Sequence, residues 1–183
     1  MEDLSLHILD VAENGLKAGA KQIRIRILED LEADRLELEV EDDGSGMDPE
    51  MTTKALDPFV TTRTTRRVGL GLPFLREAAR MTGGEVELDS FPGRGTRVRA
   101  TFQHSHIDRK PLGDMGATLV GILLGGPHVD IFYEHIRAGR TFCLDTRELR
   151  RELDPVPITQ PEVLEWIRQR VREGLRGIGA LES

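Results

Sequence analysis

Two polar side chains near the start of the chain have the types and spacing of a magnesium site. Asp10 and Asn14 lie four residues apart in the segment LDVAENGLKAGA, so on a helix both project from the same face. An amide oxygen can ligate Mg²⁺, and a neighbouring carboxylate can orient or deprotonate a water molecule. For such a pair in isolation, a solvated helix face is the more ordinary interpretation.

Two glycine-containing motifs follow further along the chain. Asp42 ends an alternating segment and is followed by Gly44 and Gly46. Glycines let the backbone approach a flat ligand closely, and a carboxylate at that place can accept the exocyclic amine of adenine. The sequence GLGL, residues 69–72, opens a predicted helix whose free N–H groups can hold phosphate oxygens. Taken singly, the Asp-Gly motif is better interpreted as an ordinary turn, and a lone GxG is weak evidence because it also occurs where a glycine packs at a helix start.

Hydroxyl and arginine side chains surround these glycines in the sequence. Residues 61–67 read TTRTTRR, and Thr62 and Arg63 among them could reach a terminal phosphate. The later motif GRGT ends at Thr96, whose hydroxyl can also be offered to a phosphate. An ordinary hairpin turn is the alternative interpretation for Gly93.

In combination, these motifs resemble the GHKL superfamily, which contains gyrase-type topoisomerases, heat-shock chaperones of the ninety-kilodalton class, sensor histidine kinases and mismatch-repair ATPases. The resemblance covers residues 4–102 and is closest to the catalytic ATP-binding domain of sensor histidine kinases. The stretch DPFVTTR is similar to the one before the second glycine box in nitrogen-regulation-type kinases. The N box of this superfamily is similar to the segment LDVAENGLKAGA. Its first glycine box is similar to DDGSGM and its second to VGLGLPF, and its last motif is similar to GRGTRVRATF.

The resemblance implies ATP and Mg²⁺ as cofactors and assigns roles to residues. Asn14 would ligate magnesium and Asp42 would bind adenine. Asp10 falls where hydrolytic members place a glutamate base and kinases often place an asparagine, so ATP binding is expected and hydrolysis is left open. The implied nucleotide-binding residues are Asp42, Gly44, Gly46, Thr62, Arg63, Gly69, Leu70, Gly71, Leu72 and Thr96.

The elements that must position these residues follow the order helix, two strands, helix, helix, two strands. The first two strands alternate apolar with charged residues, which predicts a hairpin with one buried face and opposite charges that can pair on the other. This order predicts an α+β two-layer sandwich with its helices on one face of the sheet, as in the Bergerat fold that the resemblance implies. The predicted helices cover 4–16, 49–55 and 72–81, and the strands 23–28, 35–42, 85–90 and 96–102.

The rest of the chain is expected to form a linker, residues 103–116, and a small α+β interaction domain, residues 117–183. GDMGATLVGILLGG predicts a buried helix or strand, and a hairpin turns at Ala138-Gly139. Asp145 begins a capped helix, and a last amphipathic helix starts near Pro161. We expect Cys143 to be buried and Trp166 to pack on the sandwich rather than anchor a partner.

The net charge, the apolar runs and the cysteine count argue against several classes of protein. A net charge of −7 argues against nucleic acid as a partner, which needs a positive footprint. No apolar run approaches the ~20 residues of a membrane span, and the acidic start lacks a signal peptide's basic region, so a cytoplasmic protein is expected. The single cysteine excludes an intramolecular disulfide framework and a four-cysteine metal site.

Two functions remain open from the sequence. One is a Mg-ATP-binding regulatory protein that acts on a partner as a nucleotide-operated switch or ATPase subunit. The other is a protein kinase that phosphorylates a partner in trans, on histidine or, as anti-sigma-type kinases do, on serine. Only 13 residues precede Asn14, so no phosphoacceptor helix pair is expected ahead of it. His7 is expected to be a core or interface histidine, and His104 and His106 a linker pair; the oligomeric state is open.

Overall fold

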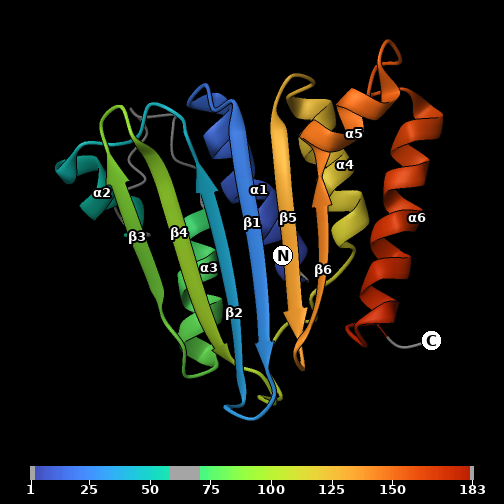
Figure 1. Ribbon diagram of the computed structural model, residues 1–183. Coiled ribbons are helices and arrows are strands. Elements are labelled where there is room, and N and C mark those ends of the chain that lie inside the picture. Colours follow the sequence, from blue (N-terminus) through green and yellow to red (C-terminus); the bar gives the residue numbers. More distant parts are fainter. Residues whose placement is uncertain (1–2, 58–70, 182–183) are drawn as a thin grey trace.

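The computed structural model describes residues 3–57 and 71–181, and these form one six-stranded sheet in the order β3-β4-β2-β1-β5-β6. Helices α1, α3 and α4 cover one face of the sheet, and α6 packs on α4 beside β6 (Figure 1). The predicted α+β architecture is confirmed. The bounds are α1 Leu4–Lys17, β1 Gln22–Asp30, β2 Arg35–Asp42, α2 Pro49–Ala55, α3 Gly71–Met81, β3 Val86–Phe91, β4 Gly95–Gln103, α4 Met115–Gly125, β5 Asp130–Arg137, β6 Arg140–Asp145, α5 Thr146–Leu153 and α6 Pro161–Gly177.

Alternation along β1 produces the buried face of the sheet. Ile23, Ile25 and Ile27 are at most 1% exposed and face the helices. β2 pairs with β1 in antiparallel register, with Ile25 opposite Val40, so the apolar sides of both strands coincide. The predicted hairpin with one buried face is confirmed, and it is the platform that carries Asp42 at the end of β2.

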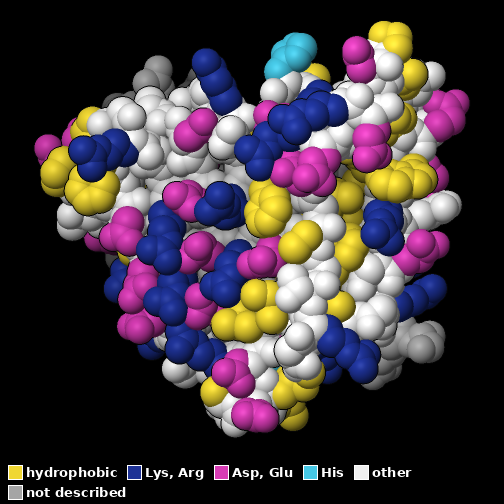
Figure 2. Space-filling view, in the orientation of Figure 1, with side chains coloured by type: hydrophobic (Ala, Val, Ile, Leu, Met, Phe, Trp, Pro, Cys, Tyr) yellow, Lys and Arg dark blue, Asp and Glu magenta, His cyan; other side chains and the backbone are white. Residues whose placement is uncertain are grey.

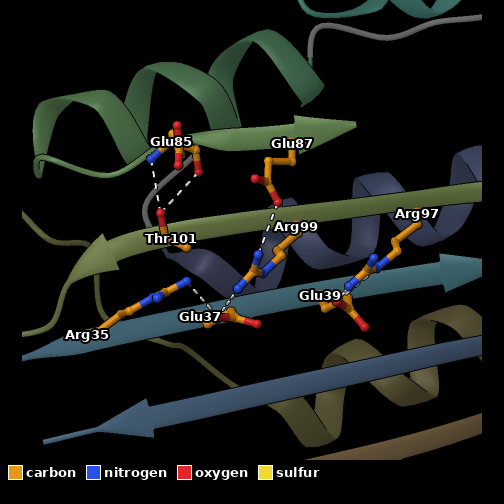
Figure 3. A network of polar contacts seen from close by, with 8 residues as sticks. All are labelled: Arg35, Glu37, Glu39, Glu85, Glu87, Arg97, Arg99 and Thr101. Atoms are coloured by element: carbon orange, nitrogen blue, oxygen red, sulfur yellow. Dashed lines mark hydrogen bonds and ion pairs between the residues drawn. The ribbon is translucent and has the colours of Figure 1, made fainter. Parts of the chain in front are cut away.

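The opposite face of the sheet is lined with ion pairs on its β3–β4–β2 side (Figure 2). Glu39 accepts from Arg97 at 2.6 Å, and Arg99 bridges Glu37 at 2.8 Å and Glu87 at 3.1 Å (Figure 3). The charges were expected to pair across the β1–β2 hairpin. The glutamates of β2 instead meet the arginines of β4, the other neighbour of β2 in the sheet.

The C-terminal part of the chain continues the same sheet. β5 lies parallel to β1, with Ile23 opposite Ile131, and β6 follows as its antiparallel neighbour. The segment predicted as helix or strand is the helix α4, which packs between α1 and α6. Strands from both sides of residues 103–116 therefore share one sheet, and the division into separate folding units stays a prediction.

Two side chains of this part depart from expectation. Cys143 is exposed rather than buried, because Phe142 and Leu144 occupy the inward positions of β6 and alternation turns the cysteine outward. Trp166 is 47% exposed, since the buried stripe of α6 runs instead through Val163, Ile167 and two further apolar residues. None of the described helices has the length and apolarity needed to cross a membrane.

A buried carboxylate ties β1 to the segments that flank it. Glu29 is 8% exposed, and its oxygens lie 2.8 Å from Nε2 of both His104 and His135 and contact Arg137. His135 is itself fully buried, and its Nδ1 lies 2.9 Å from the Tyr133 hydroxyl. His104, expected to belong to a linker pair with His106, is thus held in the network.

The network lowers the pKa of the Glu29 carboxyl. Burial by itself raises the pKa of this carboxyl, but hydrogen bonds from His135 and His104 and the charge of Arg137 outweigh burial and lower the pKa from 4.5 to about 2. A carboxyl whose pKa is lower in the folded protein stabilises the fold above its unfolded pKa and loses that contribution on acidification. For Glu29 the loss runs from about pH 4.5 down to about pH 2.

We therefore expect Glu29→Gln to destabilise the protein at pH 7 by about 3 kcal/mol, since each pKa unit corresponds to about 1.4 kcal/mol. Chemical denaturation at a series of pH values measures this. The stability difference between wild type and variant should shrink between about pH 4.5 and about pH 2. The same substitution at the exposed Glu32 is the control; a Glu29 variant as stable as that control at pH 7 contradicts the prediction.

Candidate functional site

A cavity of about 470 Å³ opens between α1, the ends of β2 and β4, and the loop after β2. This volume is that of a small-molecule site. Both apolar and polar side chains line it, so it can hold a flat apolar ring and still present polar contacts. Its lining residues are Val11, Asn14, Gly15, Lys17, Ala18, Asp42, Ser45, Gly46, Met47, Met51, Leu72, Thr96 and Val98.

The helix α1 brings Asn14 to the cavity and Asp10 to its flank. Asn14 lines the cavity, as the predicted helical spacing requires. Asp10, one turn earlier, does not line it but lies against Gly71, where a Cβ would come within 2.9 Å of the Asp10 Cβ and Oδ2. Burial raises the pKa of the Asp10 carboxyl above its usual value. The predicted pair is thus divided between the cavity and the start of α3.

Asp42 is the buried acid of the cavity. It is 7% exposed, and its Oδ1 accepts the Gly44 N–H at 2.8 Å. Burial raises the pKa of this carboxyl, and the Gly44 hydrogen bond opposes the rise. A carboxylate held in this way has a fixed orientation and remains able to accept a hydrogen bond from a ligand in the cavity.

Gly15 is a site residue that sequence reasoning missed. A Cβ at this position would lie 2.9 Å from the Asp42 Cβ and 3.0 Å from its Cγ, so only glycine lets α1 come this close to Asp42. The available signal was a glycine inside a predicted helix, which costs about 1 kcal/mol relative to alanine and therefore asks for a packing reason.

The loop after β2 is anchored at both of its ends. Asp43 Oδ1 accepts the N–H groups of Lys21 at 2.7 Å and Gln22 at 2.8 Å, which fixes the loop to the start of β1. Gly46 has a φ of +67°, and a Cβ there would lie 2.0 Å from the Phe91 carbonyl oxygen. Glycine at 46 was predicted for the close approach of a ligand, and the close approach that the structure shows there is that of the β3 backbone.

The hydroxyl of Thr96 takes part in a second anchor. Thr96 pairs with Asp42 across β2 and β4, and its hydroxyl lies 2.9 Å from that of Ser90. Ser90 is buried, accepts the Met47 N–H at 2.8 Å and contacts the Gly95 carbonyl at 3.1 Å. Ser90, which sequence reasoning also missed, thereby joins the cavity wall to β3.

The structure gathers most of the predicted site residues. Asn14, Asp42, Gly46, Leu72 and Thr96 line one cavity. The Gly44 N–H donates a hydrogen bond to the Asp42 carboxylate, and Gly71, the first residue of α3, lies against Asp10. The other predicted residues, Thr62, Arg63, Gly69 and Leu70, lie outside the residues that the structure describes.

The residues present fit a magnesium ion only in the company of a phosphate ligand. In the described part of the chain, no group of three or more His, Cys, Asp or Glu side chains could hold a metal ion. Asn14 offers one amide oxygen at the cavity, and Mg²⁺ commonly takes only one or two protein ligands and completes its shell with phosphates and waters. The donor set thus agrees with a metal that arrives with a nucleotide.

Sequence relatives are found among bacterial signalling proteins. The chain is 40% identical over 89 residues to the sensor protein kinase FleS of Pseudomonas aeruginosa, which covers 49% of this chain and 22% of the relative. It is 33% identical over 104 residues to the sensor histidine kinase YxdK of Bacillus subtilis, covering 54% of this chain and 32% of the relative. The chain thus spans a third or less of the length of these relatives.

Among solved structures, the Aquifex aeolicus MutL ATPase domain complexed with ADP is similar, with a TM-score of 0.45 and 16% identity over 79% of this chain and 63% of that one. The model of the family described as histidine kinase-, DNA gyrase B-, and HSP90-like ATPases matches residues 2–106. That range is more than half of the 183 residues and contains α1 to β4 with the whole cavity. The chain therefore belongs to the family of histidine kinase-, DNA gyrase B- and HSP90-like ATPases.

Proposed function

We propose that this protein binds Mg-ATP in the cavity beside Asp42 and acts on a partner protein as a nucleotide-operated switch or ATPase subunit. The observation that carries the proposal is the enclosure of Asp42 and Asn14 in one cavity of about 470 Å³, in a chain of the ATPase family. A cytoplasmic location and a partner bound through the C-terminal segment, residues 117–183, belong to the same proposal.

Each wall of the cavity has a role in this proposal. Asp42 accepts the exocyclic amine of adenine, while Met47, Leu72 and Val98 supply apolar surface for the ring. In this proposal the N–H groups at the start of α3 bind the phosphates, as helix N-termini do for anions. Asn14 ligates the magnesium ion, which when bound offsets the charge of the phosphates.

Asp10 is the candidate base for hydrolysis. Burial raises the pKa of its carboxyl. A general base is most effective when its pKa lies near the working pH, so a raised pKa makes this carboxylate a better base at neutral pH. A switch requires that the nucleotide bind two conformations with different affinities. The contact of Asp10 with Gly71 joins the helix that carries Asn14 to the start of α3, so bound nucleotide can act on both.

The second candidate function is a protein kinase that acts in trans on a histidine or serine of a partner. It is favoured by the names of the relatives, which include a sensor protein kinase and a sensor histidine kinase. In that function the γ-phosphoryl group passes to the partner rather than to water. Asp10 would then serve to orient the nucleotide-bound magnesium and its waters.

Asn14→Ala is expected to remove the magnesium-dependent part of ATP affinity, because the substitution deletes the only amide oxygen assigned to the ion. Incubation with γ-labelled ATP and co-purifying partners separates the two functions. Label on a partner that disappears with Asn14→Ala favours the kinase, and free phosphate alone favours the ATPase. Absence of ATP binding by the wild-type protein at millimolar concentration contradicts both.

Asp10→Asn is expected to leave ATP affinity within about twofold of wild type and to lower hydrolysis by about 100-fold, the scale of general-base catalysis. The amide keeps the volume of the carboxylate against Gly71 but cannot take a proton. Single-turnover release of labelled phosphate measures the effect. Unchanged turnover removes Asp10 from the role of base.

Gly15→Ala is expected to weaken ATP binding at least tenfold, because the added methyl meets the Asp42 side chain at 2.9 Å and pushes α1 away from it. Alanine favours helix by about 1 kcal/mol over glycine, so a loss of affinity cannot come from helix propensity. Gly177→Ala is the matched control, since its Cβ would meet nothing within 4 Å. Calorimetric titration compares the variants; equal affinities contradict the packing argument.

A further inference from the structure

Three polar side chains form a row across β2, β4 and β3 at the end of the sheet that borders the large cavity (Figure 1). Asp42 on β2 pairs with Thr96 on β4, and Thr96 pairs with Ser90 on β3. Residues directly opposite each other on neighbouring strands project from the same face of a sheet. Asp42 and Thr96 line the cavity, whereas Ser90 is 7% exposed and stands next to Thr96 on the side away from Asp42.

The hydroxyl of Ser90 has three hydrogen-bond partners. It accepts the Met47 N–H at 2.8 Å, donates to the Gly95 carbonyl at 3.1 Å and lies 2.9 Å from the Thr96 hydroxyl. A hydroxyl has one proton to donate and two lone pairs with which to accept. Because the carbonyl of Gly95 can only accept, it takes the proton of Ser90. The remaining bond must then be one that Thr96 donates to Ser90.

This assignment fixes what the Thr96 hydroxyl presents to the cavity. Its single proton is directed at Ser90, so only its lone pairs remain for a ligand. The neighbouring Asp42 carboxylate, which accepts the Gly44 N–H, is also an acceptor. Two adjacent acceptors suit an amino group, which has two N–H donors, and they repel a carbonyl oxygen in the same place.

We propose that Ser90 is a positioning residue, which holds the Thr96 proton away from the cavity and thereby makes the site selective for a base with an exocyclic amine. The inference rests on the proposed binding of Mg-ATP and deepens it. It assigns Thr96 to the base of the nucleotide rather than to the phosphates, because its hydroxyl has no free proton to donate to them. Ser90 itself contacts no ligand and acts through Thr96.

Calorimetric titration of the full chain with Mg-ATP and with the magnesium complex of inosine triphosphate (ITP) tests the proposal. In ITP a carbonyl oxygen replaces the exocyclic amine of ATP, and the ribose and phosphates are the same. The wild-type protein should prefer ATP. Ser90→Ala frees the Thr96 proton to turn toward the carbonyl oxygen, so the ratio of ATP to ITP affinity should fall about tenfold, the usual scale for one hydrogen bond. An unchanged or larger ratio overturns the proposal.

The ratio separates the positioning role from a structural one. Ser90→Ala also deprives the Met47 N–H of its acceptor, which weakens the binding of both nucleotides alike and leaves the ratio unaffected. Thr96→Val removes the hydroxyl at nearly constant shape and should lower the ratio by itself. Adding Ser90→Ala to Thr96→Val should then change the ratio no further, because coupled residues are not additive. An equal fall in both backgrounds contradicts an action through Thr96.

Two further variants serve as controls. Thr96→Ser keeps a hydroxyl that can donate to Ser90, so it should retain the wild-type ratio. Ser105→Ala makes the same replacement as Ser90→Ala at an exposed serine, whose hydroxyl bonds to Asp34. It should leave both affinities unchanged. Loss of the ratio in either control contradicts the assignment.

Nuclear magnetic resonance without nucleotide distinguishes failure of this inference from failure of the proposed function. A hydroxyl proton held in a hydrogen bond exchanges slowly, so in a mixture of light and heavy water the carbon signal of the Thr96 Cβ should split in two. Ser90→Ala should merge the two signals. A single signal in the wild type overturns the assignment. If the wild-type protein binds neither nucleotide, the proposed function fails, and the splitting still decides whether Ser90 holds the Thr96 proton.

Discussion

The close approach of α1 to the end of β2 is the constraint on which the site depends. Gly15 and Gly44 both lie against the Asp42 side chain, and Gly95 lies against its backbone, where a Cβ would come within 1.9 Å of the carbonyl oxygen. A methyl group at any of these positions would separate the helix or a neighbouring strand from Asp42. Because protein interiors are close-packed, such a shift cannot be absorbed locally and would open the cavity.

The same helix contacts both the proposed site and the C-terminal part of the chain. α1 packs against α3 on one side and α4 on the other, so it touches both the proposed phosphate side of the site and the C-terminal part of the chain (Figure 1). The N–H groups of Leu4 and Ser5 bond to the carbonyls of Pro111 and Leu112, which fixes the start of α1 to the segment before α4. α1 therefore contacts both parts directly, which the proposed switch requires of the helix that carries Asn14.

Residues that act through local spacing could be predicted, whereas residues that act through distant partners could not. The sequence could suggest Asn14 and Asp42, which line the cavity, because helical spacing and a strand end are visible in a short segment, and the family match confirmed the resemblance built on them. Gly15 and Ser90 were missed because their reasons lie in Asp42 and Met47, which are far away in sequence. Glu29 was missed for the same cause, since its partners come from β5 and from the chain after β4.

The sequence by itself determined the order of the elements and, except for α4, their kinds, because alternation, helical periodicity and caps such as Asp48 and Asp145 act within a few residues. Only the tertiary structure decided which strands are neighbours. β5 pairs with β1 although about a hundred residues separate them in the sequence. The glutamates of β2 form ion pairs with the arginines of β4 rather than with those of β1. Which strands become neighbours depends on the free energy of burying whole apolar faces together. That free energy depends on segments far apart in the chain, so no single segment determines it.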